Sequence, residues 1–382
     1  MRPLLRALAV LFCIAPAAMA QEEPPRRLDF GTDSVERQAP RDTATVTSRE
    51  LRTAFVRSQT ILGLTVYGPA FSAMVADDAV TATAAYFVLA GGSFFAANEI
   101  ARRAVITPSR QFLSSRMAWR GTLNGLELAS VLDLDRRPAA ALTLLGGVGG
   151  TATGLVLGRG RTEGEAVSMV VGHDVAYVSA LLIGYIIDPT DYDGRGISRQ
   201  TRRLASTALG WVGYALGNRY AATAFYEVTP GDAMLLWVGA SLGTTTVWAI
   251  IAEAEPSRQA VAATILVGGL GGIWAADRWL VRQYDHTTAD GTLVSLGSLA
   301  GGLMGIGVGV LIAGEAERGA SLTLALASLG GLGGVILTER YVAPRRDEGR
   351  QYLLGRVEFN PLGAAAVAAR APGAHSIVRF TF

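Results

Sequence analysis

The amino-acid sequence predicts a mainly α, membrane-embedded array of antiparallel helical hairpins that pack through glycine, followed by a small C-terminal β-hairpin. Half of the 382 residues are hydrophobic and only 17% are charged. One glycine-rich phrase recurs as LLGGVGG at 144–150, LVGGLGG at 266–272 and SLGGLGG at 328–334. Apolar runs of about twenty residues surround these phrases, which is enough for a helix to cross a bilayer core of roughly 30 Å.

Residues 1–20 predict a signal peptide. Arg2 and Arg6 precede an apolar run that ends in Ala-Met-Ala, the small-x-small pattern of a cleavage site after Ala20. Lipid attachment at Cys13 is the alternative, although bulky Phe12 stands where a lipoprotein has a small residue. Cys13 is the only cysteine, so cleavage leaves a mature chain without thiols. Residues 21–57 are polar and contain prolines, which predicts a disordered exported tail.

Two helical segments precede the repeats. Residues 58–104 predict an N-terminal helical hairpin, because Asp77 and Asp78 separate two apolar stretches. In residues 105–137, Arg110, Arg116 and Arg120 alternate with bulky apolar residues. This pattern predicts an amphipathic interfacial helix that lies along a membrane surface.

Residues 138–343 predict a helical repeat domain with a period of about 60 residues. The glycine phrase recurs around residues 146, 268 and 330, with a weaker GWVGY at 210–214. A second apolar run follows each phrase except the last. Two of these runs begin after Thr229 and Thr287, which suit helix N-caps. Each unit is therefore expected to be a pair of antiparallel helices whose first helix carries the glycine phrase.

The glycines are expected to be helix-packing residues. In water, an interior glycine costs a helix about 1 kcal/mol relative to alanine, whereas in lipid the cost of unsatisfied backbone keeps the helix intact. Small residues spaced i, i+4 then let two backbones approach closely. The predicted packing residues are Gly146, Gly150, Gly239, Gly243, Gly268, Gly272, Gly301, Gly305, Gly330 and Gly334.

Two other folds are open alternatives. A soluble all-α repeat array would bury every apolar face, but its helices should keep a charged outer stripe, and residues 294–313 and 321–338 contain no charge. A transmembrane β-barrel would need polar and apolar residues to alternate over about ten positions. The long runs of glycine, alanine and leucine do not alternate in this way.

Residues 344–382 predict a C-terminal β-hairpin with a turn at Pro372-Gly373. Val378, Phe380 and Phe382 alternate at the chain end, over a segment of about eight residues. This segment resembles the closing strand of bacterial outer-membrane proteins, in which a terminal Phe with alternating apolar residues serves as the assembly signal. The chain thus resembles Gly-rich helical-repeat envelope proteins. The resemblance slightly favours the outer membrane over the inner membrane.

Two motifs could carry chemistry. His173 and Asp174 lie in the middle of an apolar run, where an ionisable pair is costly in lipid, so they are the candidate ion or proton pathway. A polar packing contact is the alternative role for this pair. Ser241, in the G-x-S-x-G pattern GASLG, could be a nucleophile paired with His173 or His286. Small-residue packing explains Ser241 equally well.

Several classes of chemistry are not predicted. No Cys/His cluster indicates a metal site, no nucleotide-binding or nucleic-acid-binding pattern is complete, and no cofactor is expected. We therefore expect a non-enzymatic structural or scaffolding membrane protein of the bacterial cell envelope. Its expected partners are membrane lipid, its own copies or other envelope proteins. The alternatives are a transporter or channel that uses His173 and Asp174, and an intramembrane serine hydrolase.

Overall fold

The structure is a computed structural model that describes residues 48–188, 198–313 except 253, 255 and 284, 319–342, 356–359 and 378–381. The predicted signal peptide lies outside the described residues, as does most of the predicted tail. The chain divides into two compact units, Met1–Val335 and Ile336–Phe382.

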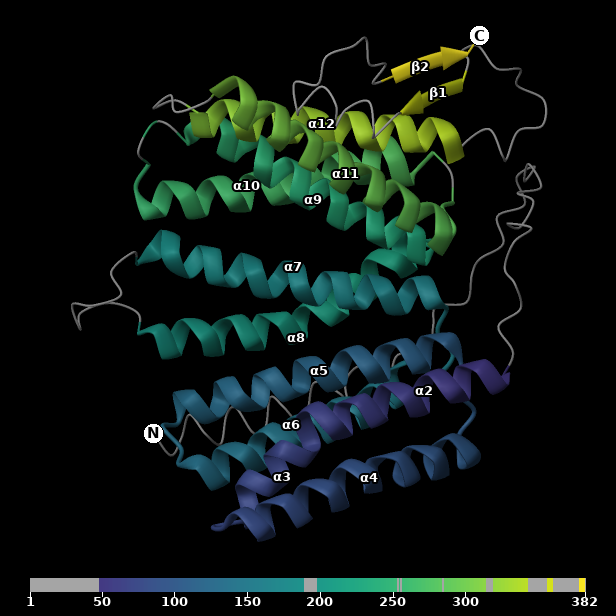
Figure 1. Cartoon of the computed structure of the whole chain (residues 1–382), viewed down its shortest axis with the longest axis vertical. Helices are drawn as coiled ribbons and strands as arrows, with labels where there is room; N and C mark the ends of the chain where they lie inside the picture. The colour runs from purple at the N-terminus through teal and green to yellow at the C-terminus, as the bar shows by residue number, and fades with distance from the viewer. Residues whose placement is uncertain are drawn as a thin grey trace, which may run out of the picture. The chain divides into compact units, whose positions relative to one another are not determined.

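Helices make up the described part of the first unit. In chain order they are α2 (Ser48–Leu62), η1 (Gly63–Tyr67), α3 (Gly68–Val75), α4 (Ala79–Arg103), α5 (Pro108–Val131), α6 (Arg136–Leu157), α7 (Glu163–Ile187), α8 (Arg199–Thr223), α9 (Pro230–Ile251), α10 (Arg258–Ala276), η2 (Asp277–Val281), α11 (Thr288–Ala313) and α12 (Gly319–Val342). The last residues of α12, from Ile336 to Val342, belong to the second unit. The π-helical turn η1 joins α2 and α3 into one helix, and η2 continues α10. Within residues 48–335, these helices alternate in direction along the chain (Figure 1).

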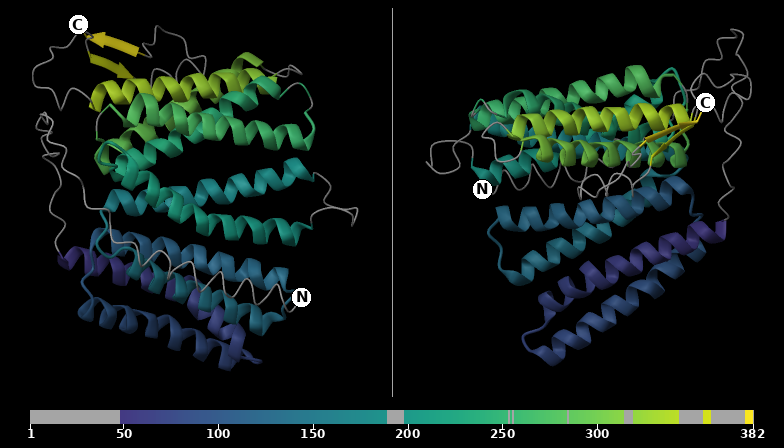
Figure 2. Two further views of the ribbon diagram at one scale, coloured as in Figure 1. Left: turned by 180° about the vertical axis from the view of Figure 1, so that it is seen from behind. Right: turned by 45° about the horizontal axis from the view of Figure 1, so that its top comes forward.

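Successive helices pair as antiparallel hairpins. The helix formed by α2, η1 and α3 packs against α4, α5 against α6, α7 against α8, α9 against α10, and α11 against α12. Contacts of α5 with α7, and of α9 with α7 and α11, place the hairpins in chain order (Figures 1 and 2). A helix-by-helix array of this kind is what the repeated apolar runs predicted.

The helix starts define two ends of this array. At the threonine end, four helices begin after a threonine whose hydroxyl accepts a backbone N–H, namely Thr107, Thr162, Thr229 and Thr287. At the serine end, α8 and α10 begin after Ser198 and Ser257, which accept in the same way. Such caps satisfy N–H groups that a helix start leaves without partners.

Seven of the described helices are long and apolar enough to cross a membrane: α4, α6, α7, α9, α10 with η2, α11 and α12. Only 6% of the apolar window of α4 and 11% of that of α11 is buried inside the protein. Exposure of these faces to water would forfeit about 25 cal/mol per Å² of apolar surface. The helices therefore support a membrane-embedded protein over a soluble array. The mainly helical structure contradicts the β-barrel alternative.

The repeat is offset by one helix from the expected unit. The glycine phrases were expected in the first helix of each pair, but they lie in the second helix of each hairpin, in α6, α8, α10 and α12. The segment 105–137, expected as an interfacial helix, accordingly supplies α5, the partner of α6. Hydropathy could not decide this pairing, because each glycine helix has an apolar run near it on both sides.

The first helix begins earlier than expected. α2 starts at Ser48, inside the segment 21–57 that was predicted as an exported tail. Phe55 is fully buried and lies in one apolar cluster with Ala97, Ala101 and Ile106. Burying a Phe side chain contributes about 2 kcal/mol, which favours order in this part of the chain.

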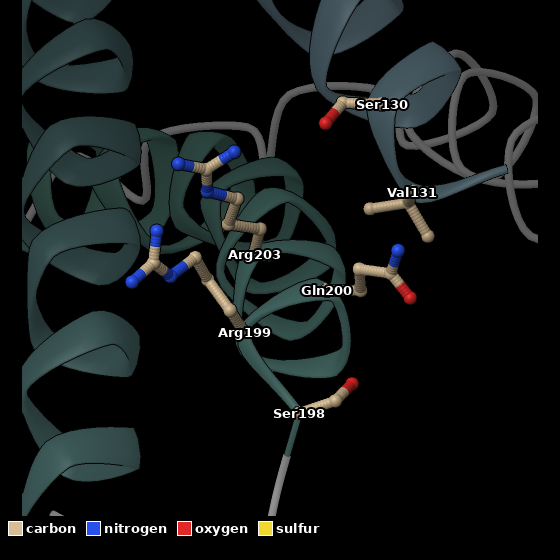
Figure 3. A pocket seen from close by; sticks show the side chains of 6 residues that line it. All are labelled: Ser130, Val131, Ser198, Arg199, Gln200 and Arg203. Carbon is tan, nitrogen blue, oxygen red and sulfur yellow. The ribbon is translucent and has the colours of Figure 1, made fainter. Parts of the chain in front are cut away.

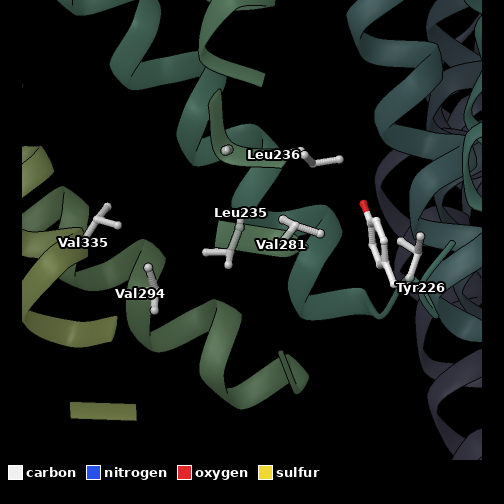
Figure 4. Packing of buried hydrophobic residues seen from close by; sticks show 8 residues of the cluster. Tyr226, Leu235, Leu236, Val281, Val294 and Val335 are labelled. Atoms are coloured by element: carbon white, nitrogen blue, oxygen red, sulfur yellow. The ribbon is translucent and has the colours of Figure 1, made fainter. Parts of the chain in front are cut away.

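A buried apolar cluster joins α9 to its neighbours near the threonine end (Figure 4). Leu235 of α9 and Val294 of α11 are fully buried within it. The other members are Tyr226, Val228, Leu236, Ala276, Val281 and Val335. The third and fourth repeat hairpins thus share one core, besides the contacts inside each hairpin.

The described strands of the second unit form an antiparallel pair. β1 (Arg356–Phe359) and β2 (Val378–Thr381) are aligned so that Val357 is opposite Phe380 and Phe359 is opposite Val378. Both strands lie within residues 344–382, where the hairpin was predicted. Phe382 lies outside the described residues.

Candidate functional site

All ten glycines predicted as packing residues lie at hairpin interfaces. A Cβ atom placed on any of them would come within 3.0 Å of a backbone oxygen on the facing helix, closer than real Cβ atoms come. Several contacts are reciprocal: Gly239 faces Gly272, Gly243 faces Gly268, and Gly301 faces Gly330. The two backbones of a hairpin thus meet directly, and no side chain fits between them.

Sequence reasoning missed other glycines of the same interfaces. Gly121 of α5 faces Gly146, and Gly172 of α7 faces Gly213. The pairs Gly121-Gly125 and Gly213-Gly217 carry the same i, i+4 spacing, which could have identified them. With these residues included, direct glycine contacts occur in each of the four repeat hairpins.

In each of the glycine phrases at 144–150, 266–272 and 328–334, one glycine has a different environment. A Cβ atom placed on Gly149, Gly271 or Gly333 would meet no atom within 4 Å among the described residues. The next residue in each phrase faces the backbone of the partner helix, as described above for Gly150, Gly272 and Gly334. The chain therefore contains three pairs of adjacent glycines, each with one constrained and one open position.

His173 and Asp174 of α7 meet Arg120 of α5. Arg120 Nε donates to His173 Nδ1 at 3.1 Å, and a terminal guanidinium nitrogen donates to Asp174 Oδ1. The side chain of His173 is 5% exposed, and those of Arg120 and Asp174 are 19% and 25% exposed. An ion pair thus lies midway along a helix that is apolar enough to span a membrane, where unpaired charge is costly.

His173 Nδ1 has two neighbours. It lies 3.1 Å from Arg120 Nε, which can only donate, and 3.1 Å from Asp174 Oδ1, which accepts when ionised, so the tautomer of the imidazole follows from which of the two it engages. The Nε2 atom faces Gly210 and has no hydrogen-bond partner among the described residues. The hydroxyl of Tyr214 also has no hydrogen-bond partner among the described residues. The ring centroid of Tyr214 lies 4.6 Å from that of His173. The surroundings of His173 therefore include two buried polar atoms that still need partners.

A second carboxylate lies nearer the serine end. Glu127 Oε1 accepts from the Tyr177 hydroxyl at 2.6 Å, and Oε2 accepts from Thr207 Oγ1 at 2.7 Å. Tyr177 also stacks on His173, with ring centroids 6.2 Å apart and an interplanar angle of 8°. These residues form a continuous polar seam between α5, α7 and α8, made of Arg120, Glu127, His173, Asp174, Tyr177 and Thr207.

A hollow of about 410 Å³ lies at the serine end of this seam (Figure 3). It is lined by Ser130 and Val131 of α5 and by Ser198, Arg199, Gln200 and Arg203 of α8. Along α5, Glu127 lies about one helical turn farther from the serine end than Ser130. Along α8, Thr207 lies about one turn farther from that end than Arg203. The bond between Glu127 and Thr207 therefore lies about one helical turn deeper along the helices than the residues that line the hollow.

Two further carboxylates join hairpins at the threonine end. Asp232 Oδ1 accepts from the backbone N–H of His286 at 3.1 Å and lies 2.8 Å from His286 Nδ1, and both residues are fully buried. Asp277 Oδ1 accepts from the hydroxyls of Tyr220 at 2.8 Å and Tyr226 at 2.7 Å. Asp277 Oδ2 accepts from Arg282 Nε at 2.7 Å. These contacts connect α9 to the start of α11 and α8 to η2.

Ser241 is placed apart from the histidines. It lies on an exposed side of α9, and its hydroxyl donates to the carbonyl of Trp237 at 3.0 Å. His286 is engaged by Asp232, as described above, and His173 is engaged by Arg120. The hydrogen bonds described for the three residues therefore do not join the serine to either imidazole.

Among the described residues, no group of three or more His, Cys, Asp or Glu side chains could hold a metal ion. The chain was also compared with known proteins. No family model, curated protein or solved structure matches it.

Removal of Arg120 should destabilise the protein. In the Arg120→Met variant, Asp174 would lose its cationic partner midway along α7, at an expected cost of about 3 kcal/mol. In the Arg120→Met/Asp174→Asn double variant, most of this loss should be recovered, because no net charge is left behind. Unfolding of the four members of this cycle in detergent measures the coupling. Strictly additive losses would show that the two side chains do not interact.

Proposed function

We propose that this chain is a non-enzymatic structural or scaffolding component of a bacterial envelope membrane. The observation that carries this proposal is the direct backbone contact in each of four successive hairpins. Such contacts hold helix pairs at fixed separation and oppose sliding between them. The carboxylates of Asp174, Asp232 and Asp277 also support a structural role, because each pairs with a side chain of a neighbouring helix or linker.

The proposed location is an envelope membrane after signal-peptide cleavage, with the outer membrane favoured over the inner one. Support for the outer membrane comes from β2, where Val378 and Phe380 alternate in a paired strand. The exposed apolar faces of α4 and α11 would contact lipid. Further partners would be copies of the chain or other envelope proteins.

A transporter or channel is the second candidate function. The polar seam favours it, since Arg120, His173 and Asp174 lie midway along spanning or adjacent helices. The serine hydrolase has weaker support, because Ser241 donates to the carbonyl of Trp237.

A complementation experiment tests the scaffolding function. Deletion of the gene in the native cells should weaken the envelope, measured as leakage of a soluble envelope enzyme and as sensitivity to detergent. Wild type and the Asp174→Asn variant should both restore the envelope, because asparagine keeps an oxygen that accepts from Arg120. The Gly272→Ile variant should fail, because its side chain would meet Gly239.

Proton and ion flux in liposomes separates the two candidates. The reconstituted protein should leave vesicles as tight as empty ones if it is a scaffold. The transporter would become the better-supported function if wild type conducts and Asp174→Asn does not, and if this variant also fails to restore the envelope. A serine-reactive probe that labels Ser241 would instead revive the hydrolase.

A further inference from the structure

Polar and apolar side chains divide the junction of α5, α7 and α8 into two halves. The polar seam runs from the hollow at the serine end to His173 in the middle of α7. The half toward the threonine end is a buried apolar plug, made of Leu113, Met117, Leu157, Ala166, Met169, Val170 and Tyr214. Five of these side chains, Leu113, Met117, Ala166, Met169 and Tyr214, have no exposed surface. The three helices, together with Leu157 of α6, therefore provide a polar half and a closed half.

Two observations indicate that water reaches the inner end of the seam. His173 Nε2 and the Tyr214 hydroxyl are buried, and neither has a partner among the described residues. A buried polar atom without a partner costs about 1–3 kcal/mol, and the cost is larger in lipid than in water. In addition, Arg120 and Asp174 keep about a fifth and a quarter of their side-chain surface exposed at a depth where ionised groups face protein or water.

We infer that the polar seam is a one-sided water site, which fills from the serine end, hydrates His173 and Asp174, and is closed beyond Tyr214 by the apolar plug. The ligand is water itself, bound by His173 Nε2, the Tyr214 hydroxyl and the carboxylates of the seam. His173 and Asp174 exchange protons with the solution at the serine end and not with that at the threonine end. This inference goes beyond the scaffolding function and does not depend on it.

The charged and titratable groups around the site come from three helices. They are Arg120 and Glu127 of α5, Asp174 and Tyr177 of α7, and Arg203 and Tyr214 of α8. His173 Nδ1 can accept from Arg120 Nε or donate to Asp174 Oδ1, each at 3.1 Å, so Nδ1 keeps a partner in either tautomer. Water at Nε2 can therefore exchange a proton with the imidazole while Arg120 and Asp174 stay paired.

Single cysteines test the access route. Cys13 is the only cysteine in the chain, so wild type supplies the background. A cysteine in place of Thr207 samples the seam, and one in place of its neighbour Ser206 is a matched control, because Ser206 is fully buried and its hydroxyl donates to the Arg202 carbonyl. Met117→Cys samples the plug. Each variant is compared with wild type for thermal unfolding in detergent, and Tyr177→Cys replaces Thr207→Cys if the latter unfolds.

The cysteines are labelled in sealed membrane vesicles with a small, water-soluble and membrane-impermeant thiosulfonate. Exposed markers identify the sides: Ser130→Cys at the serine end and Glu163→Cys at the threonine end. Thr207→Cys should react only from the side that labels Ser130→Cys, and about tenfold faster than Ser206→Cys and Met117→Cys, because packed interiors exclude the reagent. A Thr207→Cys rate equal to that of Met117→Cys, or equal labelling from both sides, would overturn the inference.

Discussion

Replacing the constrained glycines by alanine should lower the free energy of unfolding far more than replacing the glycines next to them. In the Gly150→Ala, Gly272→Ala and Gly334→Ala variants, the new methyl group would press against the backbone of the facing helix. Overpacking of this kind costs about 1–3 kcal/mol at each site, and effects at distant sites add. The triple variant should therefore lose about 3–9 kcal/mol, measured by chemical unfolding in detergent.

The matched control is the triple variant Gly149→Ala, Gly271→Ala and Gly333→Ala. These positions face open space, so the methyl groups should change the free energy of unfolding by no more than about 0.5 kcal/mol per site, with a tendency to stabilise the helix. The two triple variants have the same composition and differ only by a shift of one residue. Equal stabilities would contradict the packing of the hairpins described here.

Asp232 should be the most sensitive carboxylate at the threonine end. In the Asp232→Ala variant, the buried backbone N–H of His286 would lose its acceptor, and the N-cap of α9 would lose half of its capping box. Loss of one partner from a buried pair costs about 3–5 kcal/mol. The thermal unfolding temperature in detergent should fall accordingly, and Asp232→Asn should restore part of the loss because it keeps one accepting oxygen.

Glu165 provides the comparison for Asp232. It occupies the same position in the capping box of α7, where Thr162 is exposed and Glu165 is only partly buried. Glu165→Ala should therefore cost about 1 kcal/mol, the usual value of a cap alone. The difference between the two alanine variants measures what the contact with His286 adds. If both variants lost the same stability, the buried pair would have no role of its own.

Helix positions could be predicted from the sequence because their causes are local. The charge-free stretches 294–313 and 321–338 fall inside α11 and α12, and the threonines before α9 and α11 cap them. Glycine spacing likewise identified ten residues that prove to face a neighbouring backbone. Local hydropathy and spacing were sufficient for these features, since both act within one or two helical turns.

The pairing of helices and the polar seam could not be predicted, because their causes are not local. Arg120 meets His173 from a position 53 residues away, and nothing in either segment specifies the other. Arginines in residues 105–137 indicated a surface helix, whereas Arg120 points at Asp174. The open environment of Gly271, beside the constrained Gly272, also depends on which helix lies opposite.

Extraction of native membranes tests the central claim, that lipid surrounds the apolar faces of these helices. After washes with alkaline carbonate and with urea, the chain should stay in the membrane pellet and should dissolve only in detergent. Seven helices with large exposed apolar faces predict this result. A chain that leaves the membranes in these washes and then remains monomeric and helical in buffer without detergent would contradict the account.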